Sequence, residues 1–131
     1  MEESRLILCD TDVIIELYKN STEIIEVLKQ IGQSNIAIST ITAGELLYGA
    51  LNKKELSRIK QDINNLTLIA PDAKTSEIFL DLMTNYSLSH KLSLPDGLIA
   101  ASAIANGLEL YTLNKKDYRF IKGLVIFNPE K

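Results

Sequence analysis

Short apolar runs alternate along this chain with segments whose apolar residues recur at helical spacing. The first run, at 6–9, is apolar at every position, which is typical of a strand covered on both faces. Similar runs predict further strands at 36–38, 66–69, 110–112 and 124–127. Strands that alternate with helices build a parallel sheet with helices on both sides. The sequence therefore predicts an α/β fold, a three-layer α/β/α sandwich around a mostly parallel five-stranded sheet.

Capping residues indicate where the helices begin and end. Ser21 would cap a helix that Gly32 ends, and Pro71 with Asp72 would open a long helix that is interrupted at 85–92. Other helices are expected at about 13–19, around 45–51, at 53–64 and at 98–105.

Size and composition limit the classes of protein that this chain can belong to. With 131 residues it can bury one core but not two, so 1–131 is expected to be a single domain. The net charge of −3 argues against a protein that holds nucleic acid by bulk electrostatics alone. The acidic N-terminus does not resemble a signal peptide, and no apolar run approaches the ~20 residues that cross a bilayer. We therefore expect a cytoplasmic protein without a membrane segment.

Acidic and amide side chains occur where the predicted strands end. Asp10 ends the first strand, Glu45 lies in the first turn or so of the helix after the second, and Asp96 starts the helix before the fourth. Asn114 and Asp117 follow the fourth strand directly. In a parallel α/β fold the carboxyl ends of strands and the N-termini of helices share one edge, where functional sites lie. We therefore expect these side chains to converge there.

Crowded carboxylates need a counter-charge, because like charges raise one another's pKa. Their oxygens suit Mg²⁺ or Mn²⁺. Such a cation activates water and orients a phosphate. The pattern therefore indicates a hydrolase of phosphate esters, without naming the polymer.

Three of the acids also have a purely structural interpretation. Glu45 forms a capping box with Thr42, Asp96 suits the first turn of a helix, and Asp12 is interpreted as a helix cap. Asp10 has no such simple explanation, because a charge beside a buried strand needs a partner.

The single histidine and one basic segment complete the candidate residues. His90 has no second histidine or cysteine cluster to form a zinc site with, so we expect it on the surface or in a loop. The segment 115–122 mixes basic and aromatic residues beside the predicted acids. Such a segment is usually a solvated face, but this position makes it a plausible strip for phosphate contacts through Lys115, Lys116 and Arg119.

Four segments, taken together, resemble a known family. The segments 8–15, 39–49, 95–101 and 110–118 are similar, in order and spacing, to the successive motifs of PIN domains. The similarity spans nearly the whole chain and is greatest to the VapC-type toxins of prokaryotic toxin–antitoxin pairs. It implies an Mg²⁺- or Mn²⁺-dependent endoribonuclease that acts on RNA, forms a homodimer and is inhibited by a cognate antitoxin protein.

The resemblance also implies roles for particular residues. The acids that would hold the metal are Asp10, Glu45 and Asp96. The fourth acidic position falls on Asn114, with Asp117 nearby, so the fourth ligand and the number of metals stay open. Thr112 resembles a hydroxyl residue that lines such sites and contacts substrate. Metal-bound water would attack phosphorus in line and leave a 5′-phosphate and a 3′-hydroxyl.

Two alternatives remain at this point. Asp10 and Asp12 also resemble the Asp-x-Asp of haloacid dehalogenase-type phosphatases, in which Asp10 would be the nucleophile. The missing fourth acid also allows a non-catalytic PIN-like module that binds RNA or protein.

Overall fold

Within residues 5–129, the part of the chain that the computed structural model describes, four strands form one fully parallel sheet. Their order across the sheet is β3-β2-β1-β4, so the first strand lies beside the last. The strands are β1 (Ile7–Cys9), β2 (Ile36–Ser39), β3 (Thr67–Ile69) and β4 (Glu109–Tyr111).

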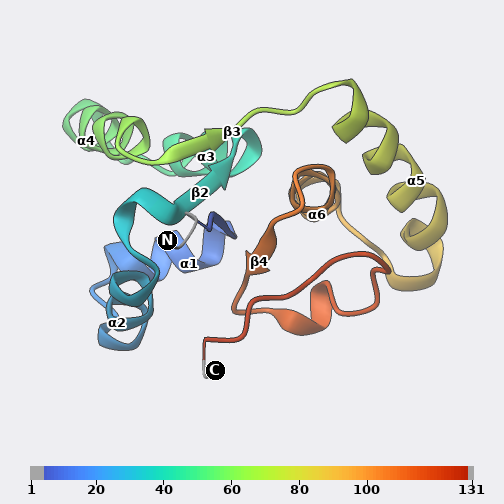
Figure 1. Cartoon of the computed structure of the whole chain (residues 1–131). Helices are drawn as coiled ribbons and strands as arrows, with labels where there is room; N and C mark the ends of the chain where they lie inside the picture. Colours follow the sequence, from blue (N-terminus) through green and yellow to red (C-terminus); the bar gives the residue numbers. More distant parts are fainter. Residues whose placement is uncertain (1–4, 130–131) are drawn as a thin grey trace.

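Six α-helices connect and cover these strands in the described part of the chain. They are α1 (Thr11–Tyr18), α2 (Thr22–Ile31), α3 (Thr40–Tyr48), α4 (Lys53–Asn64), α5 (Ala73–His90) and α6 (Leu94–Ala105). Figure 1 shows α5 and α6 on one side of the sheet and α1 to α4 on the other. None of the helices formed by residues 5–129 is long and apolar enough to cross a membrane.

Alternate side chains of each strand enter two separate hydrophobic clusters. Ile7, Cys9 and Ile38 pack with the apolar faces of α1 to α4. Leu8 and Leu110 point to the other side and pack with α5 and α6. Because both faces of the strands are covered, the predicted three-layer α/β/α sandwich is confirmed.

The lone cysteine is part of this core. Cys9 has no exposed surface, and burial raises the pKa of its thiol to about 12, ahead of smaller effects from the neighbouring acids. A thiol with this pKa stays protonated at neutral pH. Cys9 is therefore a packed residue of the core.

The prediction of a fifth strand at 124–127 is wrong. This segment runs beside β4 but forms a single parallel bridge, between Leu110 and Ile126. Two backbone hydrogen bonds, both to Leu110, hold it there. Beyond β4 the backbone N–H groups of Leu113 and Asn114 donate to the side chains of Asp12 and Thr112. The sheet therefore has four strands.

The break predicted at 85–92, before the helix at Pro95, is present only at 91–93. Helix α5 continues without interruption to His90, and Lys91 ends it in the left-handed region at φ 54°. Tyr86 lies in the middle of the supposed break and packs edge-on against Phe120. Tertiary packing of this tyrosine outweighs the weak helix propensity of the surrounding Asn and Ser residues.

Candidate active site

The strand order places one acid at the centre of the site. β1 and β4 are neighbours, and the chain that follows them packs on opposite faces of the sheet, α1 in one cluster and Tyr118 in the other. Asp10 directly follows β1, and its backbone N–H donates to the carbonyl of Tyr111 at 2.9 Å. The Thr112 hydroxyl, directly after β4, donates to Asp10 Oδ2 at 2.8 Å. Asp10 therefore lies at the edge of the sheet predicted from the sequence.

Asp10 is held firmly although it is nearly buried. Its exposed fraction is 6%. Its Oδ1 accepts the backbone N–H of Thr11 at 2.8 Å, so it also caps α1. Burial raises the pKa of Asp10, and the hydrogen bonds from Thr112 and Thr11 counteract only part of this rise. A cation beside this carboxylate would offset the cost of its burial.

Asp96 comes to the same place from α6. Ser93 caps this helix by accepting the Asp96 N–H at 3.2 Å, which puts Asp96 in the first turn. The buried Tyr118 hydroxyl donates to Asp96 Oδ1 at 2.9 Å. The charge of Asp96 is a minor cause of the raised pKa of Asp10.

Glu45 is attached to the site and does not cap its helix. The N-cap of α3 is Ser39, which accepts the Thr42 N–H at 3.3 Å, and Glu45 follows in the second turn. The hydroxyl of Thr11 donates to Glu45 Oε1 at 2.6 Å. The capping-box interpretation of Glu45 is therefore wrong, and its carboxylate is linked to the residue next to Asp10.

Asp12 is not a helix cap either, since Asp10 fills that position. Asp12 Oδ2 accepts the Leu113 N–H at 3.2 Å and the Asn114 side-chain amide at 2.9 Å. Its Oδ1 is buried and has no hydrogen-bond partner within residues 5–129. Burial, followed by the charge of Asp10, raises the pKa of Asp12 to about 6.

Asn114 and Asp117 lie on different sides of this centre. Asn114 lines a pocket of about 340 Å³ together with Asp12. Asp117, in the 3₁₀ turn η2 (Lys115–Asp117), lines another of about 210 Å³ together with Asp96 and Lys116. Of Asn114 and Asp117, it is thus Asp117 that lines the same pocket as Asp96.

Thr112, for which the sequence predicts a contact with substrate, is buried beside Asp10. Only 2% of Thr112 is exposed. Its hydroxyl donates to Asp10 and accepts the Asn114 N–H at 3.1 Å. Thr112 therefore orients Asp10, and its contact with substrate stays a prediction.

His90 lies at the edge of the site, which its sequence context did not indicate. It is exposed, as expected, but it is the last residue of α5 and not part of a loop. Its ring stacks on Phe120 with a centroid separation of 4.1 Å and an interplanar angle of 10°. Both rings line the 210 Å³ pocket beside Asp96.

The donor set fits Mg²⁺ or Mn²⁺. Within residues 5–129, no three His, Cys, Asp or Glu side chains are grouped closely enough to hold a metal ion together. Mg²⁺ does not require such a group, because it usually keeps several waters and binds one or two carboxylates plus substrate phosphate. Asp10 and Asp96 supply such a pair, with Glu45 and Asp117 around them.

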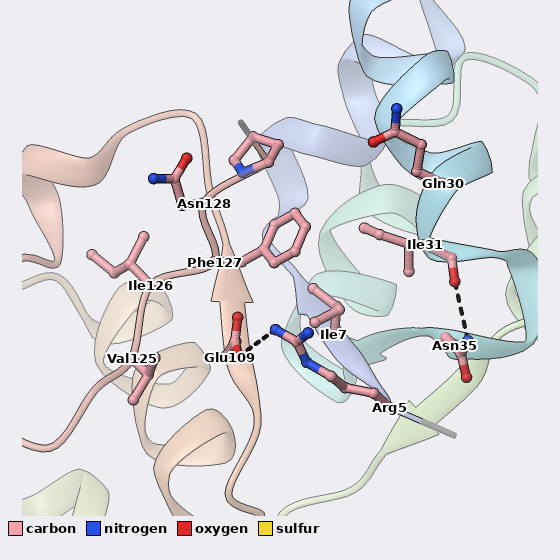
Figure 2. A pocket seen from close by; sticks show the side chains of 11 residues that line it. Arg5, Ile7, Gln30, Ile31, Asn35, Glu109, Val125, Ile126, Phe127 and Asn128 are labelled. Carbon is pink, nitrogen blue, oxygen red and sulfur yellow. Dashed lines mark hydrogen bonds and ion pairs between the residues drawn. The ribbon is translucent and has the colours of Figure 1, made fainter. Parts of the chain in front are cut away.

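A further cavity is not part of this site. Its volume is about 840 Å³, and it is lined by Ile7 and Glu109, the first residues of β1 and β4. Figure 2 shows Arg5 paired with Glu109 there, with Phe127 beside them. The cavity is therefore at the opposite edge of the sheet from Asp10.

Comparison with known proteins identifies the family. The model of the PIN domain matches residues 7–122. The chain belongs to the PIN-domain family. It is 36% identical over 105 residues to the Ribonuclease VapC2 of Rickettsia felis, covering 75% of this chain and 77% of that protein.

Solved structures agree with this assignment. A toxin–antitoxin complex from Klebsiella pneumoniae contains a chain 31% identical to this one, with a TM-score of 0.78 over 94% of this chain and 97% of that chain. DNA-bound VapBC from Salmonella typhimurium gives a TM-score of 0.83 at 25% identity, over 95% and 98% of the two chains. The predicted PIN fold and VapC-type relationship are confirmed, and the dehalogenase-type alternative is overturned.

The raised pKa of Asp12 predicts how stability depends on pH. Because its pKa is about 6 in the fold and ~3.9 in an unfolded chain, ionisation of Asp12 destabilises the fold progressively between about pH 4 and above pH 6. The full pKa shift of Asp12 corresponds to a loss of ~3 kcal/mol in the free energy of unfolding. Because the group is only half-buried, solvent screening reduces this loss to about 1 kcal/mol. Asp12→Asn should therefore stabilise the metal-free protein at pH 8 by about that amount, and much less at pH 4.5. Urea unfolding in EDTA at the two pH values measures this. An equal change in stability at pH 8 and at pH 4.5 would contradict this role of Asp12 ionisation.

Proposed function

We propose that this chain is a metal-dependent endoribonuclease that acts as the toxin of a type II toxin–antitoxin pair, with 1–131 as one nuclease domain. The observation that supports the proposal is that Asp10 and Asp96, far apart in the sequence, are both hydrogen-bonded by residues that follow β4, Thr112 and Tyr118. The similarity to a protein named as a ribonuclease supports RNA as the polymer.

In this proposal the acids bind the metal, and neighbouring residues orient them. Asp10 and Asp96 would hold the ion, Glu45 would complete the acidic site through its bond to Thr11, and Asp117 lies on the Asp96 side as a further acid. The bound ion would supply activation of water and neutralisation of the phosphate charge. Thr112 and the Thr11 N–H keep Asp10 oriented, and the Thr11 hydroxyl orients Glu45. The products would be a 5′-phosphate and a 3′-hydroxyl, without use of the RNA 2′-hydroxyl as nucleophile.

The RNA backbone would follow the basic strip that borders this site. Lys115, Lys116 and Arg119 are exposed next to the acids, and Lys116 lines the same pocket as Asp96. Phosphate contacts of this kind position a nucleic acid without reading its sequence. Asn114, turned toward Asp12, would support the site without being an acid.

We also propose a cytoplasmic homodimer that is inhibited by a cognate antitoxin. The relevant support is that similar chains from Klebsiella pneumoniae and Salmonella typhimurium were solved as toxin–antitoxin and VapBC assemblies. Light scattering of the purified chain measures whether it forms a homodimer. The same measurement after co-expression with the protein of an adjacent small reading frame tests for antitoxin binding. A monomer that gains no partner would contradict this part of the proposal.

The central test is RNA cleavage with a controlled metal supply. Purified protein should cut a susceptible RNA from a mixed cellular pool in Mn²⁺ or Mg²⁺, leave 5′-phosphate ends, and stop in EDTA. In the same assay Lys116→Ala should raise KM more than it lowers kcat, because it removes a phosphate contact only. Equal cleavage in EDTA would contradict the metal mechanism. Metal-dependent RNA binding without cleavage of any RNA in the pool would favour the non-catalytic module.

A further inference from the structure

One buried tyrosine carries a hydroxyl that core packing does not explain. Tyr118 directly follows η2 and is only 1% exposed. Its ring belongs to the cluster that joins Leu8 and Leu110 of the sheet to α6. Phenylalanine would fill the same space, and a buried hydroxyl lowers stability unless it finds a partner. The partner of this hydroxyl therefore indicates why a tyrosine and not a phenylalanine occupies the position.

The hydroxyl is directed at the acids of the site. It donates to Asp96 Oδ1 at 2.9 Å. Burial, and then the charges of Asp10 and Asp96, raise the pKa of Tyr118 far above its ordinary value, so it remains a proton donor.

The two carboxylates depend on this contact to different degrees. Asp10 is already held by Thr11 on one oxygen and by Thr112 on the other. Asp96 lies in the first turn of a helix, where its side chain is only half-buried. A phenol has a single proton to donate, and this one goes to Asp96. Tyr118 therefore sets the orientation of Asp96 relative to the better-fixed Asp10.

We propose that Tyr118 is a positioning residue for the metal: its hydroxyl holds Asp96 so that Asp96 and Asp10 can share one divalent cation. This inference rests on the proposed metal-dependent function. Hydrogen bonds from the surrounding protein fix the orientation of ligating carboxylates, and their removal typically costs about 10–100-fold in metal affinity or activity.

The test compares Tyr118→Phe with the wild-type chain by Mn²⁺ binding in the absence of RNA. Calorimetric titration should show Mn²⁺ affinity weakened by about tenfold or more in the variant. In cleavage assays the Mn²⁺ concentration for half-maximal rate should rise by a similar factor, while kcat at saturating Mn²⁺ changes little. A purely structural role would lower the melting temperature without moving the metal affinity of the folded protein.

Tyr86→Phe provides a matched control. Tyr86 packs against the same cluster, but its hydroxyl accepts the backbone N–H of Lys122 at 3.2 Å and has no bond to an acid. Removal of the Tyr86 hydroxyl should leave the Mn²⁺ affinity unchanged. Unchanged or tighter Mn²⁺ binding in folded Tyr118→Phe would overturn the positioning role. Absence of Mn²⁺ binding in the wild-type chain would instead overturn the metal-dependent function itself, and with it this inference, so the two failures are distinguishable.

Discussion

Asp10→Asn is expected to reduce metal-dependent RNA cleavage by about a hundredfold or more, because a metal ion supplies several kcal/mol and each ~1.4 kcal/mol is tenfold in rate. The substitution removes the charge at the centre of the site and half of its metal-binding oxygens. An amide keeps one acceptor oxygen for either Thr11 or Thr112, so the local fold should persist.

Cleavage rates at saturating Mn²⁺, with circular dichroism as a check on folding, measure this effect. Asp81→Asn is the control, since Asp81 is an exposed residue of α5 and the same charge is lost there without touching the site. Asp81→Asn should cleave RNA at the wild-type rate. If Asp10→Asn keeps a rate close to that of wild type, Asp10 does not hold the metal.

Leu8→Ala is expected to have the largest effect on stability, lowering the free energy of unfolding by about 2–5 kcal/mol. Leu8 has no exposed surface and lies in β1, which pairs with strands on both sides. A cavity at this point would be surrounded by Leu110 and the buried face of α6, which cannot collapse into it without moving the sheet. The loss is a large part of the ~5–15 kcal/mol that stabilises an ordinary domain.

Urea unfolding of the metal-free protein measures this loss. Leu88→Ala makes the same chemical change at a residue of α5 that is 96% exposed, and should alter stability by less than about 0.5 kcal/mol. Similar losses for the two variants would mean that Leu8 is not in the core that the structure shows.

The sequence by itself determined the class of the fold and the edge at which the acids meet. The residues of β1 are apolar at every position, and that pattern alone requires helices on both faces of a parallel strand. Once the strands are parallel, Asp10 and Asp96 must approach the same edge, because the carboxyl ends of strands and the N-termini of helices lie there. The order of the four motifs then pointed to the PIN family.

Only the tertiary structure decided which interactions these residues make. Thr112 and Asp10 are bonded across 102 positions of sequence, and Tyr118 and Asp96 across 22, distances over which local pattern carries no information. For the same reason the cap-like context of Glu45 and Asp12 was misleading, since caps are local signals and the partners of both side chains are remote. The uninterrupted α5 and the single bridge at Ile126 likewise depend on packing and pairing partners elsewhere in the chain. Helix and strand propensities of single residues differ by less than the free energy of such tertiary contacts. The contacts therefore decide the conformation.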